Sequence, residues 1–377
     1  VLTTHFDYHS IEGRMTKLDI LGHDDPTIIR MLEDLTGIDA KTIPFDDPRT
    51  LSLFSSTEGI GLTPEQLQGD QVASLAVPEC GTKFVRGMLE DSRPQTFSDL
   101  VRISGFSHGT NVWLDNAQDL IKNGTCKLNE AISTRDDVMN FLIHRGMDRK
   151  HSFFVMENVR KGKGIEKRNK QGQATTEFEA EMRENNIPEW FIDSCKKISY
   201  LFPRAHAVAY VMMAFRIAWF KVYHPLAFYA AYFSIRAKAF DLRIMTGDLK
   251  TQMTEFNRIK ALDRAASPKD KDLMSALEVS MEMYQRGYRF VNVDIQHSEA
   301  RRFSIKDGAL LPPFLAIDSL GETVADAIVA EREERPFTSL KDLQRRCKVS
   351  NTIIDLMKEL KCCGELPEDE QMSLFGA

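Results

Sequence analysis

The sequence predicts a mainly α-helical chain with a few strands, and three observations support this fold class. Residues 27–285 show little of the apolar–polar alternation that is typical of strands. A well-marked helix is expected to begin at Asp25 as N-cap, with Pro26 in the first helical position and Gly37 at the C-terminal exit. His206–Tyr223 is long and largely apolar, which indicates a buried helix.

The predicted elements follow one another along the chain. A strand with the alternation Leu18–Asp19–Ile20–Leu21 comes first, and the helix of Pro26 follows after a glycine. Helices are then predicted at residues 63–69, 81–90, 96–103, 115–122 and 134–145, and at Phe153–Gly162, Glu177–Asn185 and Glu189–Ile198. Leu226–Ala237 is expected to pack back on the long apolar helix, because His224–Pro225 interrupts the chain between them. Tyr288–Ile305 alternates enough to suggest strands, and short helices return after it.

Composition places the chain among ordinary soluble globular proteins. Its 377 residues suffice for two or three domains, and 42% of them are apolar and 28% charged. No run of about 18 apolar residues is present, so no membrane span and no membrane partner are expected. Six scattered cysteines show neither CxxC pairs nor a histidine spacing suited to zinc, which fits a reducing cytoplasmic location. The first residues lack an initiator methionine and a signal peptide, so we expect a truncated chain.

Charge is unevenly distributed along the chain. The formal net charge is −6, which argues weakly against nucleic acid. The stretch from Arg145 to Lys170 nevertheless contains nine lysines and arginines and only three acidic residues. Because the local field governs attraction, such a patch can still hold phosphates.

Asp19 is the first residue that suggests chemistry. A lone acid in an apolar strand costs free energy unless a cation or donor meets it. At a catalytic site the partner of such an acid is usually a metal ion, but one carboxylate does not hold Mg²⁺ on its own. The partners of Asp19 therefore lie elsewhere in the chain or are missing from it.

Three motifs suggest phosphate binding, each with a structural alternative. "IDSLGETVADAIVAERE" fits a helix-hairpin-helix whose turn, Ser319–Gly321, exposes backbone N–H groups to a DNA phosphate; an ordinary capped junction explains it equally well. In "KGKG", Lys161 and Lys163 could cradle phosphates, although most charge runs are only solvated faces. In "FPRAHAVAY", Arg204 and His206 begin a helix and could meet a triphosphate, but pattern alone favours a core helix with a capping histidine.

Four blocks in one order carry a family resemblance. They are "TTHFDYHSI…KLDILGHDDPTIIRMLEDLTGID", "PECGTKFVRGMLEDSRPQTFSDLVRISGFSHGTNVW", "FPRAHAVAYVMMAFRIAWFKVYHPLAFYAAYFSIRA" and "QMSLF". Together they closely resemble the PolC-type replicative DNA polymerase of Gram-positive bacteria, the C-family DNA polymerase III alpha subunit. The resemblance runs from residue 3 to the last residues and covers the C-terminal part of that family. Cys80 departs from it, because an aromatic residue is expected there.

The resemblance implies an organisation for the chain. Residues 1–27 would be the last segment of a polymerase palm with a remnant strand, and 28–245 would be all-helical fingers. Residues 246–370 would form a duplex-binding domain with a helix-hairpin-helix and a few strands, and 371–377 a clamp-binding tail. Asp19 would be the third carboxylate of a two-Mg²⁺ site for nucleotidyl transfer from dNTP to a primer 3′-hydroxyl. The other two carboxylates come from an earlier palm motif, so this chain alone is expected to be inactive.

The resemblance also implies site residues and partners. The partners would be primer–template DNA, dNTP, a sliding clamp (the beta subunit) and further replisome subunits, with the protein cytoplasmic and associated with the nucleoid. Triphosphate contacts are expected from Lys83, Arg86, Ser104, His108, Gly109, Lys161, Lys163, Arg204 and His206, and duplex contacts from Ser319, Leu320 and Gly321. The clamp peptide would consist of Gln371, Met372, Ser373, Leu374 and Phe375. A non-catalytic DNA- and clamp-binding module is the alternative, because the rest of the palm is absent.

Overall fold

The computed structural model describes residues 2–11, 14–16, 18, 22–169, 171–175 and 177–369. Two predicted features, Asp19 with most of its strand and the clamp peptide at residues 371–375, lie outside these described residues. The described chain is mainly helical with two short strands, which confirms the predicted fold class.

Helices account for most of the described elements. Those of the first half are α1 (Tyr8–Ile11), α2 (Asp25–Thr36), α3 (Pro48–Ser52), α4 (Lys83–Ser92), α5 (Phe97–His108), α6 (Gln118–Lys122), α7 (Arg135–His144), α8 (Arg149–Arg160), α9 (Phe178–Glu184) and α10 (Glu189–Lys197). The second half holds α11 (Arg204–Tyr223), α12 (Pro225–Ala231), α13 (Leu242–Met245), α14 (Leu249–Leu262), α15 (Pro268–Gln285), α16 (Glu322–Glu334), α17 (Leu340–Cys347) and α18 (Asn351–Glu359). Strands β1 (Ser304–Lys306) and β2 (Ala309–Leu311) pair antiparallel in the register Ser304–Leu311, Ile305–Leu310 and Lys306–Ala309.

Several predicted boundaries differ from the structure. Asp25 is the first residue of α2 rather than its N-cap, which is Asp24, because the Asp25 carboxylate pairs with Arg236 instead of capping the helix. Residues 63–69 form turns rather than a helix, and Gln68 has a positive φ of 60° that ends helical geometry. Most of Tyr288–Phe303 is irregular, with a single bridge from Phe290 to Leu310, so the predicted strand is reduced to β1.

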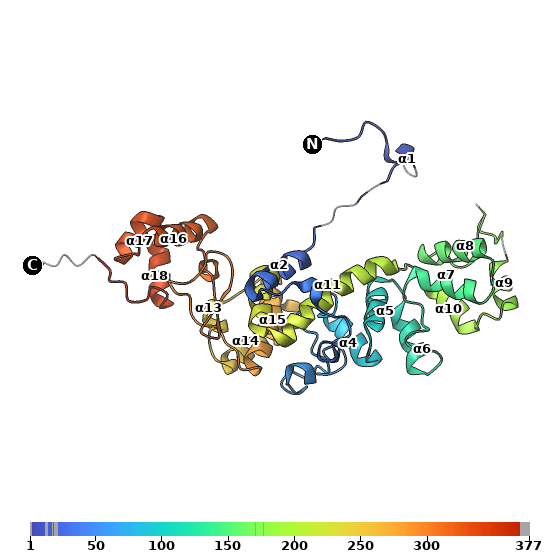
Figure 1. Ribbon diagram of the computed structural model, residues 1–377, viewed down its shortest axis with the longest axis horizontal. Coiled ribbons are helices and arrows are strands. Elements are labelled where there is room, and N and C mark those ends of the chain that lie inside the picture. Colours follow the sequence, from blue (N-terminus) through green and yellow to red (C-terminus); the bar gives the residue numbers. More distant parts are fainter. Residues whose placement is uncertain are drawn as a thin grey trace, which may run out of the picture.

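Three groups of buried apolar side chains hold the helices together. The first lies among α4, α5, α7, α8, α10 and α11, and includes Phe106, Phe191 and Phe215. The second lies among α2, α12, α14, α15 and the end of α11, and includes Phe220. The third joins α16, α17 and α18. Figure 1 shows α7–α10 at one end, α16–α18 at the other, and α11 between them.

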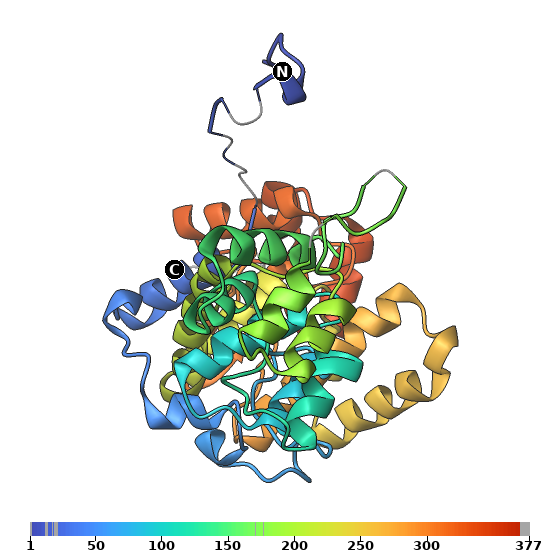
Figure 2. The same cartoon turned by 90° about the vertical axis from the view of Figure 1, so that its right-hand side faces the viewer.

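Helix α11 therefore takes part in two cores, and its sequence explains why. It spans 20 residues, and Ala207, Phe215 and Phe220 are among its fully buried side chains. By length and composition it could also cross a membrane, but half of its most apolar window is buried inside the protein. Viewed from the α7–α10 end, these green helices lie in front of the red α16–α18 group (Figure 2).

The predicted division at residue 245 stays a prediction. The second core contains residues from both sides of it, with Ile28 and Phe228 on one side and Phe256, Leu277 and Phe290 on the other. A shared core of this kind resists independent movement of the two parts, because separating them would expose apolar surface.

A buried ion pair fastens α11 to α15 within this second core. The Lys221 ammonium donates to the carbonyl oxygens of Ala73 at 2.8 Å and Leu75 at 2.6 Å, and to Oε2 of Glu282 at 2.8 Å. Both charged side chains are fully buried. Burial lowers the pKa of Lys221 to about 8, while the charge and hydrogen bond of Glu282 act to raise it. Three acceptors match the three N–H donors of an ammonium group, which favours the charged form.

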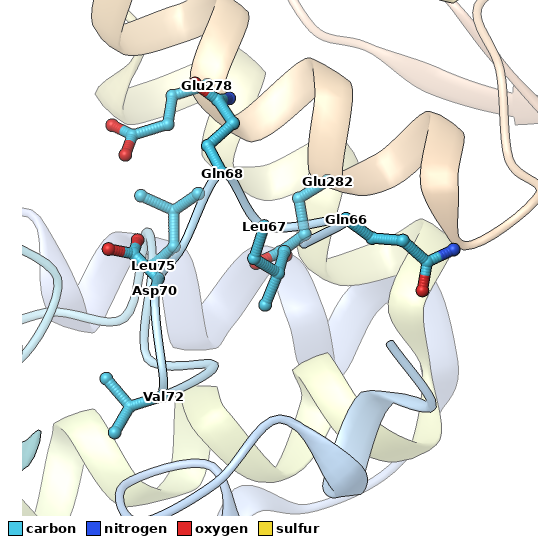
Figure 3. Close-up of a pocket in the computed structure, with 8 residues that line it drawn as sticks. All are labelled: Gln66, Leu67, Gln68, Asp70, Val72, Leu75, Glu278 and Glu282. Carbon is cyan, nitrogen blue, oxygen red and sulfur yellow. The ribbon is translucent and has the colours of Figure 1, made fainter. Parts of the chain in front are cut away.

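A small pocket lies beside this ion pair. It has a volume of about 10 Å³, which is room for roughly one water molecule. Figure 3 shows Glu278 and Glu282 of α15 facing the loop that carries Asp70 and Leu75. Two carboxylates on this wall, Asp70 and Glu278, pair with Arg86 of α4.

Replacing Lys221 by methionine should lower the free energy of unfolding by about 3–5 kcal/mol, because Glu282 would remain buried without its charge partner. Urea denaturation measures the change. Lys196→Met is the matched control, since Lys196 forms an exposed pair with Glu179 at 2.8 Å and should cost at most about 1 kcal/mol. Equal losses in the two variants would contradict the anchoring role of Lys221.

Candidate functional site

The segment of residues 199–204, which we call the junction segment, brings the ends of three helices together. The amide of Thr110, just after α5, donates to the carbonyl of Tyr200 at 3.0 Å. The amide of Leu201 donates to the carbonyl of Arg160 at the end of α8 at 3.4 Å. The carbonyl of Phe202 accepts from Arg135 at the start of α7 at 3.1 Å. The junction segment then leads directly into α11.

Glycines permit this close approach of backbones. A Cβ at Gly162 would lie 2.6 Å from the carbonyl oxygen of Ser199, and Gly162 has a φ of +68°. A Cβ at Gly109 would lie 2.4 Å from a methyl group of Val112. Both positions therefore require glycine for packing, and Gly162 requires it for conformation as well. In the "KGKG" stretch, Gly162 thus has a structural role beside any role in phosphate binding.

Asp137 organises the charges around the start of α11. Its Oδ2 accepts from the amides of Ser133 at 3.0 Å and Thr134 at 2.7 Å, which completes a capping box at α7. Its Oδ1 pairs with Arg204, and with Arg102 at 3.4 Å. Burial acts to raise the pKa of Asp137, but the two arginines and the hydrogen bonds outweigh it and lower the pKa. The carboxylate thereby holds the Arg204 guanidinium at the junction segment.

A row of stacked rings follows the surface from α5 to α2. His108 stacks on Phe202 with a centroid distance of 4.6 Å, and Phe202 meets His206 at 5.0 Å. His206 stacks on Tyr210 at 4.7 Å, and Tyr210 contacts His23 at 4.9 Å. The junction segment thus continues as an aromatic surface along the first turns of α11.

His108 is fixed from two sides. Its Nε2 lies 3.1 Å from Oε2 of Glu79, and its Nδ1 lies 2.9 Å from the carbonyl oxygen of Ser104. The hydrogen bond to Glu79 raises the pKa of His108, against the effect of burial. The hydroxyl of Ser104 is buried and makes no hydrogen bond among the described residues. Both ring nitrogens of His108 thus have partners within the protein, so a nucleotide contact from either nitrogen would require one of these interactions to rearrange.

The structure brings together six of the nine predicted nucleotide contacts. The six lie on or beside the junction segment: Ser104, His108, Gly109, Lys161, Arg204 and His206. Lys161 is exposed and its ammonium lies 3.0 Å from Glu157. Lys163 is exposed on the same loop, two residues further on.

Lys83 and Arg86 lie apart from this group, at the start of α4. Lys83 is exposed. The Arg86 guanidinium is buried between two carboxylates, with Asp70 at 2.9 Å and Glu278 at 2.7 Å. In this conformation Arg86 links α4 to α15, so its predicted nucleotide contact would require both ion pairs to rearrange.

The predicted hairpin turn has the geometry of a helix start. Ser319 has a positive φ of 64°, Leu320 is buried in the third core, and Gly321 is the N-cap of α16. A Cβ at Gly321 would meet no described atom within 4 Å, so this side of the turn is open. Exposed Arg301 pairs with Glu322 and Asp326 in the first turns of α16. The open backbone at Gly321 can therefore approach a large ligand.

Sequence reasoning missed three residues that shape the site. Asp137 could have been found, because Thr134 and Asp137 have the spacing of a capping box. No local sequence pattern marks Phe202 or Glu79, because their contacts with His108 join parts of the chain that are distant in sequence.

Comparison with known protein families finds two matches. Residues 25–186 match the family described as bacterial DNA polymerase III alpha subunit finger domain. Residues 287–371 match a helix-hairpin-helix motif. The first match runs from α2 to α9 and ends before the junction segment, and the second covers the part of the chain that contains α16–α18.

Curated relatives are similar over the whole chain. A protein of Caldanaerobacter subterraneus subsp. tengcongensis named DNA polymerase III PolC-type is 54% identical over 375 residues, which is 100% of this chain and 26% of the relative. Proteins of the same name from Bacillus subtilis and Thermotoga maritima are 53% and 52% identical, over 99% and 100% of this chain and 25% and 27% of each relative. The chain therefore spans about a quarter of the length of these relatives.

Replacing Asp137 by asparagine should lower the free energy of unfolding by about 3 kcal/mol near neutral pH, because Arg102 and Arg204 would lose their shared anion. The pKa of Asp137 is lowered in the folded state, so its contribution is fully present above the usual value of 3.8. It is lost as the pH falls through the folded-state pKa. The free energies of unfolding of the parent chain and of Asp137→Asn should therefore approach each other in acid. Urea denaturation at several pH values measures them.

Exposed Asp193 of α10 supplies the control for this experiment. Asp193→Asn should change stability by about 0.5 kcal/mol or less. A deficit in Asp137→Asn that stayed constant down to low pH would show that the charge of Asp137 is not the cause.

Proposed function

Because this chain belongs to the PolC-type DNA polymerase III family, we propose that it supplies the nucleotide-binding fingers and a duplex-binding part of a replicative DNA polymerase. Its family uses divalent metal and binds DNA.

The gathering of Arg204, His206 and His108 at the junction segment carries this proposal. A guanidinium group has a planar set of donors that suits phosphate oxygens. Arg204 is 40% exposed, and Asp137 holds its side chain in place from below. A dNTP triphosphate would then lie over the start of α11, with Lys161 and the backbone of Gly109 at its edge. Tyr210, which stacks on His206, offers an aromatic ring beside which a base could pack.

Asp19 is proposed as one Mg²⁺ ligand of this polymerase. Carboxylate oxygen is a ligand type that Mg²⁺ prefers, and the ion stabilises charge at a transferring phosphoryl group when it is bound. Residues 1–18 contain no pair of aspartates one residue apart. The chain thus offers an incomplete ligand set at Asp19, and we assign it no reaction step through the metal.

The helix start at Ser319–Gly321 is proposed to contact the duplex backbone. Phosphates and sugars are alike at every base pair, so contacts from backbone amides carry no sequence preference. The open side of Gly321 supports this role, because a phosphate needs room to approach the amides at the start of α16.

Nucleotide binding can be tested at Arg204 and His206 in a full-length polymerase that contains this chain. Arg204→Gln and His206→Ala should each raise the KM for dNTP about tenfold or more, the effect of losing about 1.4 kcal/mol of binding. Steady-state primer extension gives KM, and a duplex-binding measurement should show an unchanged Kd for DNA.

Arg183→Gln is the matched control for this experiment. Arg183 is 49% exposed and pairs with Glu179 and Glu189, away from the junction segment. An unchanged KM for dNTP in Arg204→Gln and His206→Ala would overturn the proposed nucleotide site.

The peptide Gln371–Phe375 is proposed to bind a sliding clamp. Leu374 and Phe375 are two apolar anchors beside the polar Gln371, a pattern suited to a small pocket with a polar rim. So short a peptide buries little area, and tethering to DNA-bound polymerase would raise its effective concentration.

Replacing Leu374 and Phe375 by alanine in the full-length polymerase should shorten the product made per binding event and weaken clamp binding. Incorporation of a single nucleotide should stay intact, because the peptide is remote in sequence from the nucleotide contacts. Glu365→Gln, a nearby exposed substitution, is the control. Unchanged processivity and clamp affinity in the double variant would refute this assignment.

A further inference from the structure

Three side chains with metal-binding atoms meet at the start of α2, and the proposed function uses none of them. They are His23, just before the helix, Asp25 in its first turn, and Glu79 in the loop before α4. One ligand atom of each lies within 4.8 Å of the others. Imidazole and carboxylate groups at this spacing match the ligands of divalent transition ions.

One carboxylate oxygen of Asp25 is buried without a hydrogen-bond partner among the described residues. Asp25 is fully buried, and its Oδ1 accepts from the guanidinium of Arg236 at 3.0 Å. Its Oδ2 is buried and has no hydrogen-bond partner among the described residues. Leaving a buried charged oxygen without a partner costs free energy, so such an atom calls for an explanation.

The nearest polar atom to this oxygen is itself an acceptor. Oδ2 of Asp25 lies 3.4 Å from Nδ1 of His23. That nitrogen accepts the amide hydrogen of Asp25 at 3.2 Å, so it carries a lone pair rather than a proton. Two electron-rich atoms thus face each other without a proton between them. A cation at this place would attract both.

The spacing of His23 and Asp25 fits a tetrahedral ion. Zn–N and Zn–O bonds are about 2.0–2.2 Å long, so two ligand atoms on tetrahedral zinc lie about 3.3–3.6 Å apart. The 3.4 Å between Nδ1 of His23 and Oδ2 of Asp25 already has this length. On binding, the Nδ1 lone pair would turn from the Asp25 amide to the ion, so a metal–nitrogen bond would replace one long hydrogen bond.

Each carboxylate is also held by an outer partner. Arg236 occupies one oxygen of Asp25, and His108 occupies Oε2 of Glu79 at 3.1 Å. The second oxygen of Asp25 approaches His23, and one oxygen of Glu79 lies within 4.8 Å of the ligand atoms of both residues. Metal-binding carboxylates are commonly oriented by hydrogen bonds of this kind. Glu79 in addition has a φ of +64°, a conformation that non-glycine residues adopt mainly where the surroundings impose it.

We propose that His23, Asp25 and Glu79 bind one Zn²⁺ ion, with the fourth position open to water or another small oxygen ligand. The imidazole ligand favours zinc over Mg²⁺ and Ca²⁺, which prefer all-oxygen sites. The ion would fasten the chain before α2 to the loop before α4, and through Glu79 to His108 at the end of α5. The site does not depend on the proposed function, because neither nucleotide nor DNA is one of its ligands.

Calorimetric titration of the chelator-treated 377-residue chain with Zn²⁺ tests the proposal. We expect one Zn²⁺ per chain and a rise in Tm with zinc, and at least tenfold weaker binding in Asp25→Asn and in Glu79→Gln. Co²⁺ should replace Zn²⁺ and give the visible absorption of a four- or five-coordinate nitrogen–oxygen site. Mg²⁺ should bind to this cluster far more weakly than Zn²⁺.

Glu181→Gln is the matched control, because Nδ1 of His151 lies 2.7 Å from Oε2 of Glu181 in a histidine–carboxylate pair of the same type. Its zinc binding should equal that of the parent chain. Should Asp25→Asn fail to fold by circular dichroism, His23→Asn serves instead, since the His23 side chain is 28% exposed. No saturable Zn²⁺ binding would overturn the proposal. Unchanged Zn²⁺ binding in folded variants of His23, Asp25 or Glu79 would also overturn it. The same holds for Zn²⁺ binding that is lost only in Asp19→Asn.

Discussion

The buried ion pair of Lys221 and Glu282 is the interaction on which the placement of the candidate site depends. It fixes the end of α11 to α15 and to the carbonyl groups of Ala73 and Leu75. Arg204 begins the same helix 17 residues earlier, about 26 Å away at 1.5 Å per residue. An α-helix is stiff over this length. Anchoring the C-terminal end of α11 therefore also fixes the position of its N-terminal end, which carries Arg204 and His206.

The two ends of α11 use buried carboxylates in different ways. Glu282 is enclosed with its partner, so the pair is satisfied within the protein and has no donor to offer a ligand. Asp137 is also buried, with 8% of its side chain exposed, but its partner Arg204 is 40% exposed. A charge on Asp137 therefore stabilises an arginine that still reaches the surface. This is the arrangement an anion site requires, since an unsupported arginine would lose side-chain entropy on binding.

Local features of the fold could be predicted from the sequence, while contacts between distant segments could not. Pro26 and Gly37 mark α2 correctly, because capping depends on residues a few positions apart. Arg86 was predicted to meet nucleotide, and its pairing with Glu278, 192 positions away, carries no local signal. The same holds for His108, whose partners Glu79 and Phe202 come from separate loops. The blocks that carry the family resemblance supply most of the residues at the junction segment, but the resemblance does not separate residues that support the fold from residues that face this segment.

The ring row and the carboxylates beside it make the candidate site a continuous unit. His108 belongs to both, since it stacks on Phe202 and bonds to Glu79. His23 closes the other end, where it contacts Tyr210 and approaches Asp25. A shift of the chain before α2 would therefore reach Tyr210 by ring contact and His108 through Glu79. His23, Asp25, Glu79 and His108 thus connect the chain before α2, the loop before α4 and the end of α5, so the charge balance at Asp25 and Glu79 adds to the packing that holds these segments on this face.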